Sequence, residues 1–131
     1  IMRKLLREVV LKTSGRSADA TDYLVGGKTG TADKSQGGGY DRSKLISSFV
    51  GVFPINSPKY VVIVNIDDPK QINKLRPTGG RVAAPVVGRV ISEIAPLLEV
   101  FPIKAHPPDT EGVWLRNQIK PSSRKQRIAV N

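Results

Sequence analysis

Residues 26–32, which read Gly-Gly-Lys-Thr-Gly-Thr-Ala, hold the side chains whose types and spacing are best suited to chemistry. Its glycine and alanine residues add little side-chain volume. The functional groups of the segment are therefore one ammonium group, on Lys28, and two hydroxyls, on Thr29 and Thr31. A strand interior with so little side chain is typical of a place where a ligand or another backbone approaches closely. A peptide can add to the free edge of such a strand through main-chain hydrogen bonds.

Each group in this segment has a chemical role that fits a peptide-binding cleft. Lys28 supplies a fixed positive charge, and the hydroxyls of Thr29 and Thr31 suit a terminal carboxylate. The backbone N–H of Thr31 can complete an oxyanion hole for a tetrahedral intermediate. A Gly-rich turn with a solvated lysine is the structural alternative, because short motifs often match by chance.

A phosphate-binding loop is a second alternative, and two features of the sequence argue against it. Such a loop needs a glycine five positions before Gly27, where this chain has Asp22. It also needs a helix that starts at the Lys-Thr pair, and Gly30 with a second threonine disfavours one. We therefore reject this interpretation.

Composition limits the remaining possibilities. The 131 residues are enough for one modest domain, and the chain has no cysteine and a single histidine, His106, in a proline-rich stretch. No metal site and no cofactor are predicted. The net charge of +10 favours anionic partners. A small basic module that binds nucleic acid or another polyanion is thus an alternative function, although basic residues with interleaved aromatics, which suit nucleic-acid binding, are missing.

The hydrophobic pattern predicts a helix over residues 1–12, strands at 45–53 and 60–67, and a second helix with Pro85 in its first turn. The strand at 60–67 is apolar on both faces and is predicted to be central. Residues 33–44 are predicted to be a loop, and residues 71–81 a second, polar loop. Together with the strand that holds residues 26–32, the pattern predicts an α+β fold, an antiparallel meander with flanking helices. Because the sequence starts abruptly at Ile1-Met2, in what reads as mid-helix, we expect it to be a fragment.

The Lys-Thr-Gly motif becomes more specific evidence because it is one of several motifs that occur in a fixed order along the chain. They are Met2-Arg3 at the start of a helix, Gly-Lys-Thr-Gly-Thr-Ala at 27–32, Ser48-Phe49-Val50-Gly51 with Pro54, Tyr-Val-Val-Ile-Val at 60–64, and Ala83-Ala84-Pro85-Val86. In this order they resemble the C-terminal part of the transpeptidase domain of class B penicillin-binding proteins, and most of all the septal division transpeptidases. The resemblance covers about residues 2–100, and the basic, proline-containing tail at 103–131 lies outside the transpeptidase part at 1–102.

The resemblance implies a peptidoglycan D,D-transpeptidase with a serine β-lactamase-like fold. Its substrate is a stem peptide that ends in D-Ala-D-Ala, and β-lactams acylate it. It implies that Lys28 and Thr31 are catalytic, and that Thr29, Gly30, Thr31 and Ala32 bind substrate. For the parent protein it implies cell-division partners and the periplasmic face of the bacterial inner membrane, with an anchoring N-terminal transmembrane helix.

Two motifs of the family do not occur in their expected place. The nucleophilic serine belongs to an S-x-x-K motif and the proton relay to S-x-N, both upstream of K-T-G. This sequence has no S-x-N, and its one S-x-x-K, Ser122 to Lys125, lies in a polar stretch after a proline. We therefore predict that the chain is inactive alone. Because one face of its sheet lacks its cover in the fragment, we also predict that the chain self-associates or domain-swaps, with the tail at 103–131 covering the sheet of a second copy. Asp33 also stands where a neutral residue is expected, and its carboxylate should repel a substrate carboxylate.

Overall fold

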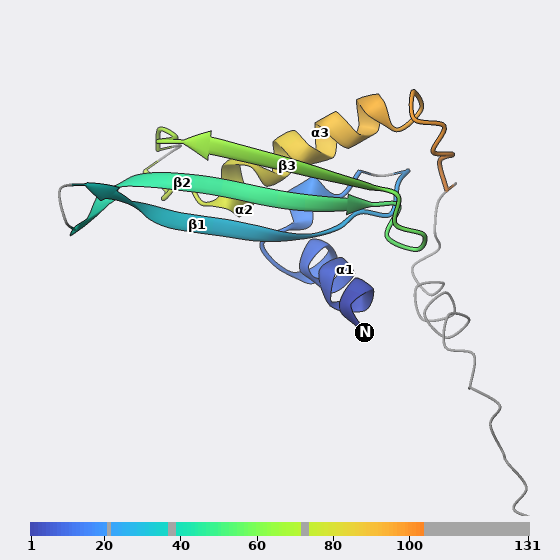
Figure 1. Ribbon diagram of the computed structural model, residues 1–131, viewed down its shortest axis with the longest axis horizontal. Coiled ribbons are helices and arrows are strands. Elements are labelled where there is room, and N and C mark those ends of the chain that lie inside the picture. Colours follow the sequence, from blue (N-terminus) through green and yellow to red (C-terminus); the bar gives the residue numbers. More distant parts are fainter. Residues whose placement is uncertain (21, 37–38, 72–73, 104–131) are drawn as a thin grey trace, which may run out of the picture.

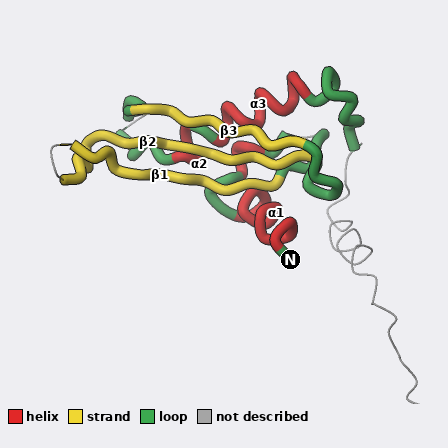
Figure 2. The backbone as a smooth tube through the Cα atoms, in the orientation of Figure 1, coloured by secondary structure: helices red, strands yellow, loops and turns green. Residues whose placement is uncertain are grey.

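The computed structural model describes residues 1–20, 22–36, 39–71 and 74–103. In chain order the elements are α1 (Met2–Lys12), the 3-10 helix η1 (Arg16–Ala18), β1 (Gly26–Gln36), β2 (Gly39–Phe53), β3 (Tyr60–Asp67), α2 (Gly79–Val82) and α3 (Ala84–Ile94). The three strands form one antiparallel sheet in the order β1-β2-β3, with α3 running along it (Figure 1 and Figure 2). The predicted α+β meander is confirmed.

One face of the sheet, the inner face, packs against α3 and forms the core. Alternate residues in the second half of β2 point to this face and are buried: Ser47, Phe49, Gly51 and Phe53. From α3, Val87 and Ile91 are fully buried against them. Since α3 has its apolar residues on one stripe and begins with a proline in its first turn, its position follows from the sequence.

Phe49 is the central side chain of this core, and two glycines make room for it and for α3. A Cβ atom built on Gly27 comes within 2.6 Å of two ring carbons of Phe49. Gly51 lies across the pair from Gly27, and a Cβ there comes within 2.7 Å of Val87. Any larger residue at either position must therefore displace the aromatic ring or α3. The glycine at position 27 thus serves packing as well as access to the strand.

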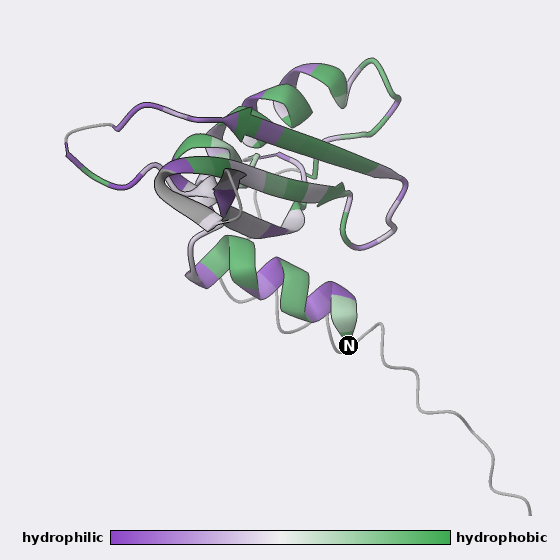
Figure 3. Cartoon of the chain, turned by 60° about the vertical axis from the view of Figure 1, so that its left-hand side comes forward, coloured by the Kyte–Doolittle hydropathy of each residue, from purple (hydrophilic) through white to green (hydrophobic). Residues whose placement is uncertain are grey.

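The opposite face of the sheet, the outer face, has no cover among the described residues. Its large apolar side chains form a row whose members are 37–61% exposed: Ile46, Val50, Val61 and Ile63. Val50 and Ile63 are direct cross-strand partners, so the row is continuous across β2 and β3. The first part of α1 is also bare, and Figure 3 shows the hydrophobic residues along α1 and β3.

Two predictions about the strands are wrong. The strand at 60–67 has the predicted bounds, but in the described part of the chain it is an edge strand, and β2 is central. Its outer-face residues Val61 and Ile63 are apolar, although no described residue covers that face. The predicted loop at 33–44 is mostly strand, because β1 continues to Gln36 and β2 starts at Gly39. Two of its glycines, 37 and 38, lie outside the described residues.

The C-terminal region ends the described structure. Helix α3 stops at Ile94, two residues before Pro96, whose ring cannot continue a helix. His106, the S-x-x-K at 122–125 and nearly all of the predicted tail lie outside the described residues. Within the described ranges, no helix has the length and apolar character needed to cross a membrane.

Candidate functional site

All residues of the predicted site lie on β1, which pairs with β2 on one side and has no strand partner on the other within the described structure. The register pairs Lys28 with Val50 and Thr29 with Phe49. Alternation along the strand therefore places Thr29 and Thr31 on the inner face. Lys28, Gly30 and Ala32 belong to the outer face.

Although Lys28 belongs to the outer face, its side chain bends back and contacts the next residue, Thr29. Its Nζ donates a hydrogen bond to the carbonyl oxygen of Thr29 at 2.9 Å and lies 3.5 Å from the Thr29 Oγ1. The Thr29 Oγ1 is also 3.2 Å from the Oγ of Ser14. The structure thus brings an ammonium group and two hydroxyls together at the edge strand. Ser14, from the turn after α1, is not identified by the sequence analysis, since no motif marks it.

A segment predicted as loop, residues 76–79, docks onto the strands beside the motif. The backbone N–H of Gly79 donates to the Thr31 Oγ1 at 3.0 Å, and the buried Ser47 hydroxyl donates to the Pro77 carbonyl. A Cβ atom on Gly79 would collide with the carbonyl oxygens of Gly30 and Ser48. Glycine is needed there because two backbones touch. The Gly79-Gly80 pair is the sequence signal that points to this contact.

Two ion pairs hold β1 just beyond the motif, where its register with β2 shifts between Asp33 and Lys34. The Arg76 Nη2 lies 2.6 Å from the Asp33 Oδ1, and the Lys34 Nζ lies 2.7 Å from the Asp67 Oδ1. The hydrogen bond to Asp67 raises the pKa of Lys34 above its ordinary value. Asp67 therefore has a structural partner, and no group of metal-ligating side chains occurs among the described residues.

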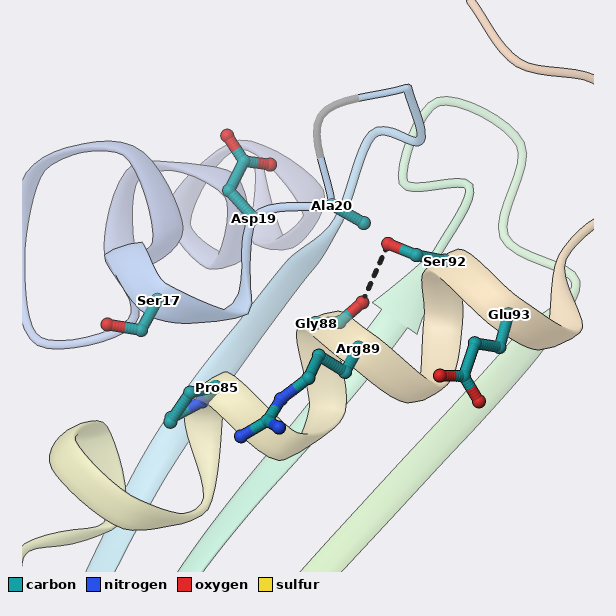
Figure 4. Close-up of a pocket in the computed structure, with 8 residues that line it drawn as sticks. All are labelled: Ser17, Asp19, Ala20, Pro85, Gly88, Arg89, Ser92 and Glu93. Atoms are coloured by element: carbon teal, nitrogen blue, oxygen red, sulfur yellow. Dashed lines mark hydrogen bonds between the residues drawn. The ribbon is translucent and has the colours of Figure 1, made fainter.

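A groove of about 370 Å³ lies elsewhere, between η1 and α3 (Figure 4). It is lined by Ser17, Asp19, Ala20, Pro85, Gly88, Arg89, Ser92 and Glu93. A Cβ atom on Gly88 comes within 2.9 Å of the Ser17 carbonyl oxygen, so the groove flanks a close crossing of the two elements. The Ser92 hydroxyl donates to the Gly88 carbonyl oxygen at 2.9 Å. None of the K-T-G-T residues lines this groove.

Comparison with known proteins identifies the family of this chain. The family model described as "Penicillin binding protein transpeptidase domain" matches residues 1–92. The chain is 43% identical over 103 residues to stage V sporulation protein D of Bacillus subtilis, covering 79% of this chain and 16% of that protein. It is 41% identical to the probable peptidoglycan D,D-transpeptidase FtsI of Caulobacter vibrioides, over 76% of this chain and 19% of that protein.

Solved structures agree with the sequence relatives. The transpeptidase domain of penicillin-binding protein 3 from Burkholderia pseudomallei aligns with a TM-score of 0.67 and 37% identity, over 80% of this chain and 30% of that one. Penicillin-binding protein 3 from Mycobacterium tuberculosis, complexed with ampicillin, aligns with a TM-score of 0.66 and 25% identity, over 81% of this chain and 25% of that one. The chain thus spans less than a third of each of these proteins. The resemblance drawn from the motifs is confirmed: the chain belongs to the family of penicillin-binding protein transpeptidase domains.

Proposed function

We propose that this chain is the C-terminal part of a peptidoglycan D,D-transpeptidase and supplies one wall of its active site. The observation that carries the proposal is the K-T-G-T segment on an edge strand, with the Lys28 ammonium group and the Thr29 and Ser14 hydroxyls in hydrogen-bond contact. The parent protein crosslinks stem peptides that end in D-Ala-D-Ala. A serine outside this chain attacks the carbonyl carbon between the two D-alanines, forms an acyl-enzyme and releases the last D-alanine.

In this proposal the substrate lies along the free edge of β1. Its terminal carboxylate accepts hydrogen bonds from the hydroxyls of Thr29 and Thr31. The Thr31 oxygen accepts from Gly79, and because a hydroxyl has one donor and two acceptor positions, its proton stays free for the carboxylate. Lys28 supplies the positive charge that favours the anionic substrate. The Thr31 N–H stabilises the oxyanion, a role that belongs to preorganised donors.

The same groups account for β-lactam recognition. Penicillin-binding protein 3 of M. tuberculosis, to which this chain is 25–26% identical, has been solved with ampicillin and with aztreonam. Ampicillin carries a carboxylate beside a reactive amide, as the stem peptide does, so the same two hydroxyls can hold it. The motif resemblance is the basis for three further parts of the proposal: septal division as the cellular role, division proteins as partners, and the periplasmic face of the inner membrane as the location.

Replacing Thr31 by valine is expected to lower the efficiency of acylation by penicillin in the full-length protein. Valine keeps the shape of threonine but removes a hydroxyl that donates to a carboxylate, and such charge-assisted bonds contribute about 1.5–3 kcal/mol. That corresponds to roughly 10- to 150-fold in second-order acylation rate, measured by stopped flow. Thr31→Ser, which keeps the hydroxyl, is the matched control and should stay within a few-fold. Unchanged acylation with a lowered melting temperature would show that the Thr31 hydroxyl has only a structural role, as the acceptor for the Gly79 N–H.

The 131-residue chain alone is expected to be inactive and to self-associate. Fluorescent penicillin should label the full-length protein covalently, in competition with unlabelled penicillin, and should leave the chain alone unlabelled. A bare sheet edge templates pairing with another chain, and an uncovered apolar row favours an interface with a second copy. Light scattering at micromolar concentration should therefore show dimers or larger species. Specific labelling of the chain alone would contradict the expected inactivity. A folded, monodisperse monomer would contradict the expected self-association.

The alternative function, a basic module that binds nucleic acid or another polyanion, rests on the net charge of +10. Its affinity for a nucleic acid should fall steeply with salt, because binding releases counterions. The transpeptidase proposal predicts no such binding at physiological salt, so a salt titration separates the two functions.

A further inference from the structure

We propose that Arg76 is a positioning residue that allows the K-T-G-T strand to accept a carboxylate, because it neutralises Asp33. The proposal rests on the proposed function and deepens it. It assigns a role to a side chain that lies 43 positions away from Asp33 in sequence and outside every motif considered above.

Asp33 lies in the same row as the two hydroxyls that are proposed to hold the substrate carboxylate. Thr29, Thr31 and Asp33 are alternate residues of β1 and are paired with Phe49, Ser47 and Leu45, three buried residues of the inner face. Alternate residues of a strand are about 7 Å apart. A lone carboxylate at the end of this row therefore repels a second one that binds at the hydroxyls, and like charges placed close together disfavour binding.

Arg76 removes this obstacle with an ion pair of good geometry. Its Nη2 lies 2.6 Å from the Asp33 Oδ1, and the Asp33 side chain is 29% exposed. An exposed ion pair by itself adds little to stability. The pair is important here because it presents no net charge to a third group, the bound carboxylate. The pair thus explains how an aspartate is tolerated directly after Lys-Thr-Gly-Thr-Ala.

The Arg76 side chain is presented by a segment whose main chain is fixed. The Arg76 carbonyl oxygen accepts from the Arg81 Nη1 at 3.0 Å, and the Pro77 carbonyl oxygen accepts from the buried Ser47 hydroxyl. Two residues on, Gly79 donates to Thr31. The segment that neutralises Asp33 is therefore the one that orients the Thr31 hydroxyl. The ion pair and the hydroxyl form one unit at the end of the motif.

The test is a double-mutant cycle on acylation of the full-length protein by benzylpenicillin, a β-lactam that carries a carboxylate. Arg76→Gln should lower the second-order rate constant on the order of tenfold, mostly through weaker initial binding, since Asp33 is left unpaired. Asp33→Asn in that background should restore the rate to within about twofold of wild type. Asp33→Asn alone should acylate at least as fast as wild type. Arg89→Gln, the same charge change in the groove on α3, is the control for net charge and should match wild type.

A purely structural role for Arg76 predicts a different pattern. In that case Asp33→Asn alone also breaks the contact and slows acylation, and the double variant remains as slow as Arg76→Gln. That pattern, or an Arg76→Gln rate within twofold of wild type, overturns the proposal. If Arg76→Gln fails to fold, as judged by circular dichroism, Asp33→Asn alone decides between the two roles. A wild-type protein that benzylpenicillin does not acylate at all refutes the proposed function instead, which keeps the two failures distinct.

Discussion

Replacing Lys28 by alanine in the full-length protein is expected to slow acylation by penicillin about 100-fold or more, because removal of one preorganised electrostatic group costs about 2.7 kcal/mol or more. The Lys28 side chain is on the outer face of an exposed edge strand and donates to the Thr29 carbonyl oxygen, so its loss should leave the fold intact. Acylation is measured by stopped flow or by time-resolved labelling with fluorescent penicillin.

A lysine away from the motif provides the control for this prediction. Lys59 is exposed in the turn before β3, and Lys59→Ala removes the same charge from the chain. It should acylate at the wild-type rate. If Lys28→Ala acylates within a few-fold of Lys59→Ala, the assignment of the K-T-G-T strand to the active site is wrong.

Replacing Phe49 by alanine is expected to give the largest loss of stability, about 3–5 kcal/mol in the free energy of unfolding. The ring is fully buried, and it fills the space that Gly27 leaves on the inner face. A loss of this size is a large share of the 5–15 kcal/mol typical of a folded domain, so the variant should unfold at much lower urea concentration or fail to fold.

Ile63→Ala is the matched control for Phe49→Ala, because it removes a large apolar side chain from the other face of the same sheet. Ile63 is 60% exposed, and its replacement should cost about 1 kcal/mol or less. Equal urea midpoints for the two variants would contradict the assignment of the inner face as the core. The measurements use equal protein concentrations, because self-association makes apparent stability depend on concentration.

The elements with strong periodicity are the ones that sequence reasoning located well. The strand at 60–67 has the predicted bounds, and the inward residues of β2 are those that alternation selects. Helix α3 starts with Pro85 in its first turn and ends before Pro96. In each case a single local rule decides: period 2 for strands, period 3.6 for helices, and the fixed φ of proline.

The features that sequence reasoning missed depend on contacts between distant parts of the chain. The position of β3 at an edge follows from which strands pair, and its apolar residues on both faces do not reveal this. Residues 33–36 were expected to be loop, but they pair with β2, and Asp33 and Lys34 form ion pairs with residues far away in the sequence. The Arg76–Asp33 pair spans 43 positions, so nothing local predicts it. Ser14 reaches Thr29 only because the turn after α1 lies beside β1.

The central claim is that residues 28–31 bind the carboxylate and the oxyanion of an acylating substrate. A crystal structure of the full-length protein acylated by penicillin tests it most directly. We predict that the penicillin carboxylate lies within hydrogen-bond distance of the Thr29 and Thr31 hydroxyls, that its acyl carbonyl oxygen accepts from the Thr31 N–H, and that Lys28 lines the same cleft. A penicillin bound with its carboxylate and acyl oxygen away from β1, or acylation at a site that β1 does not border, would contradict the claim.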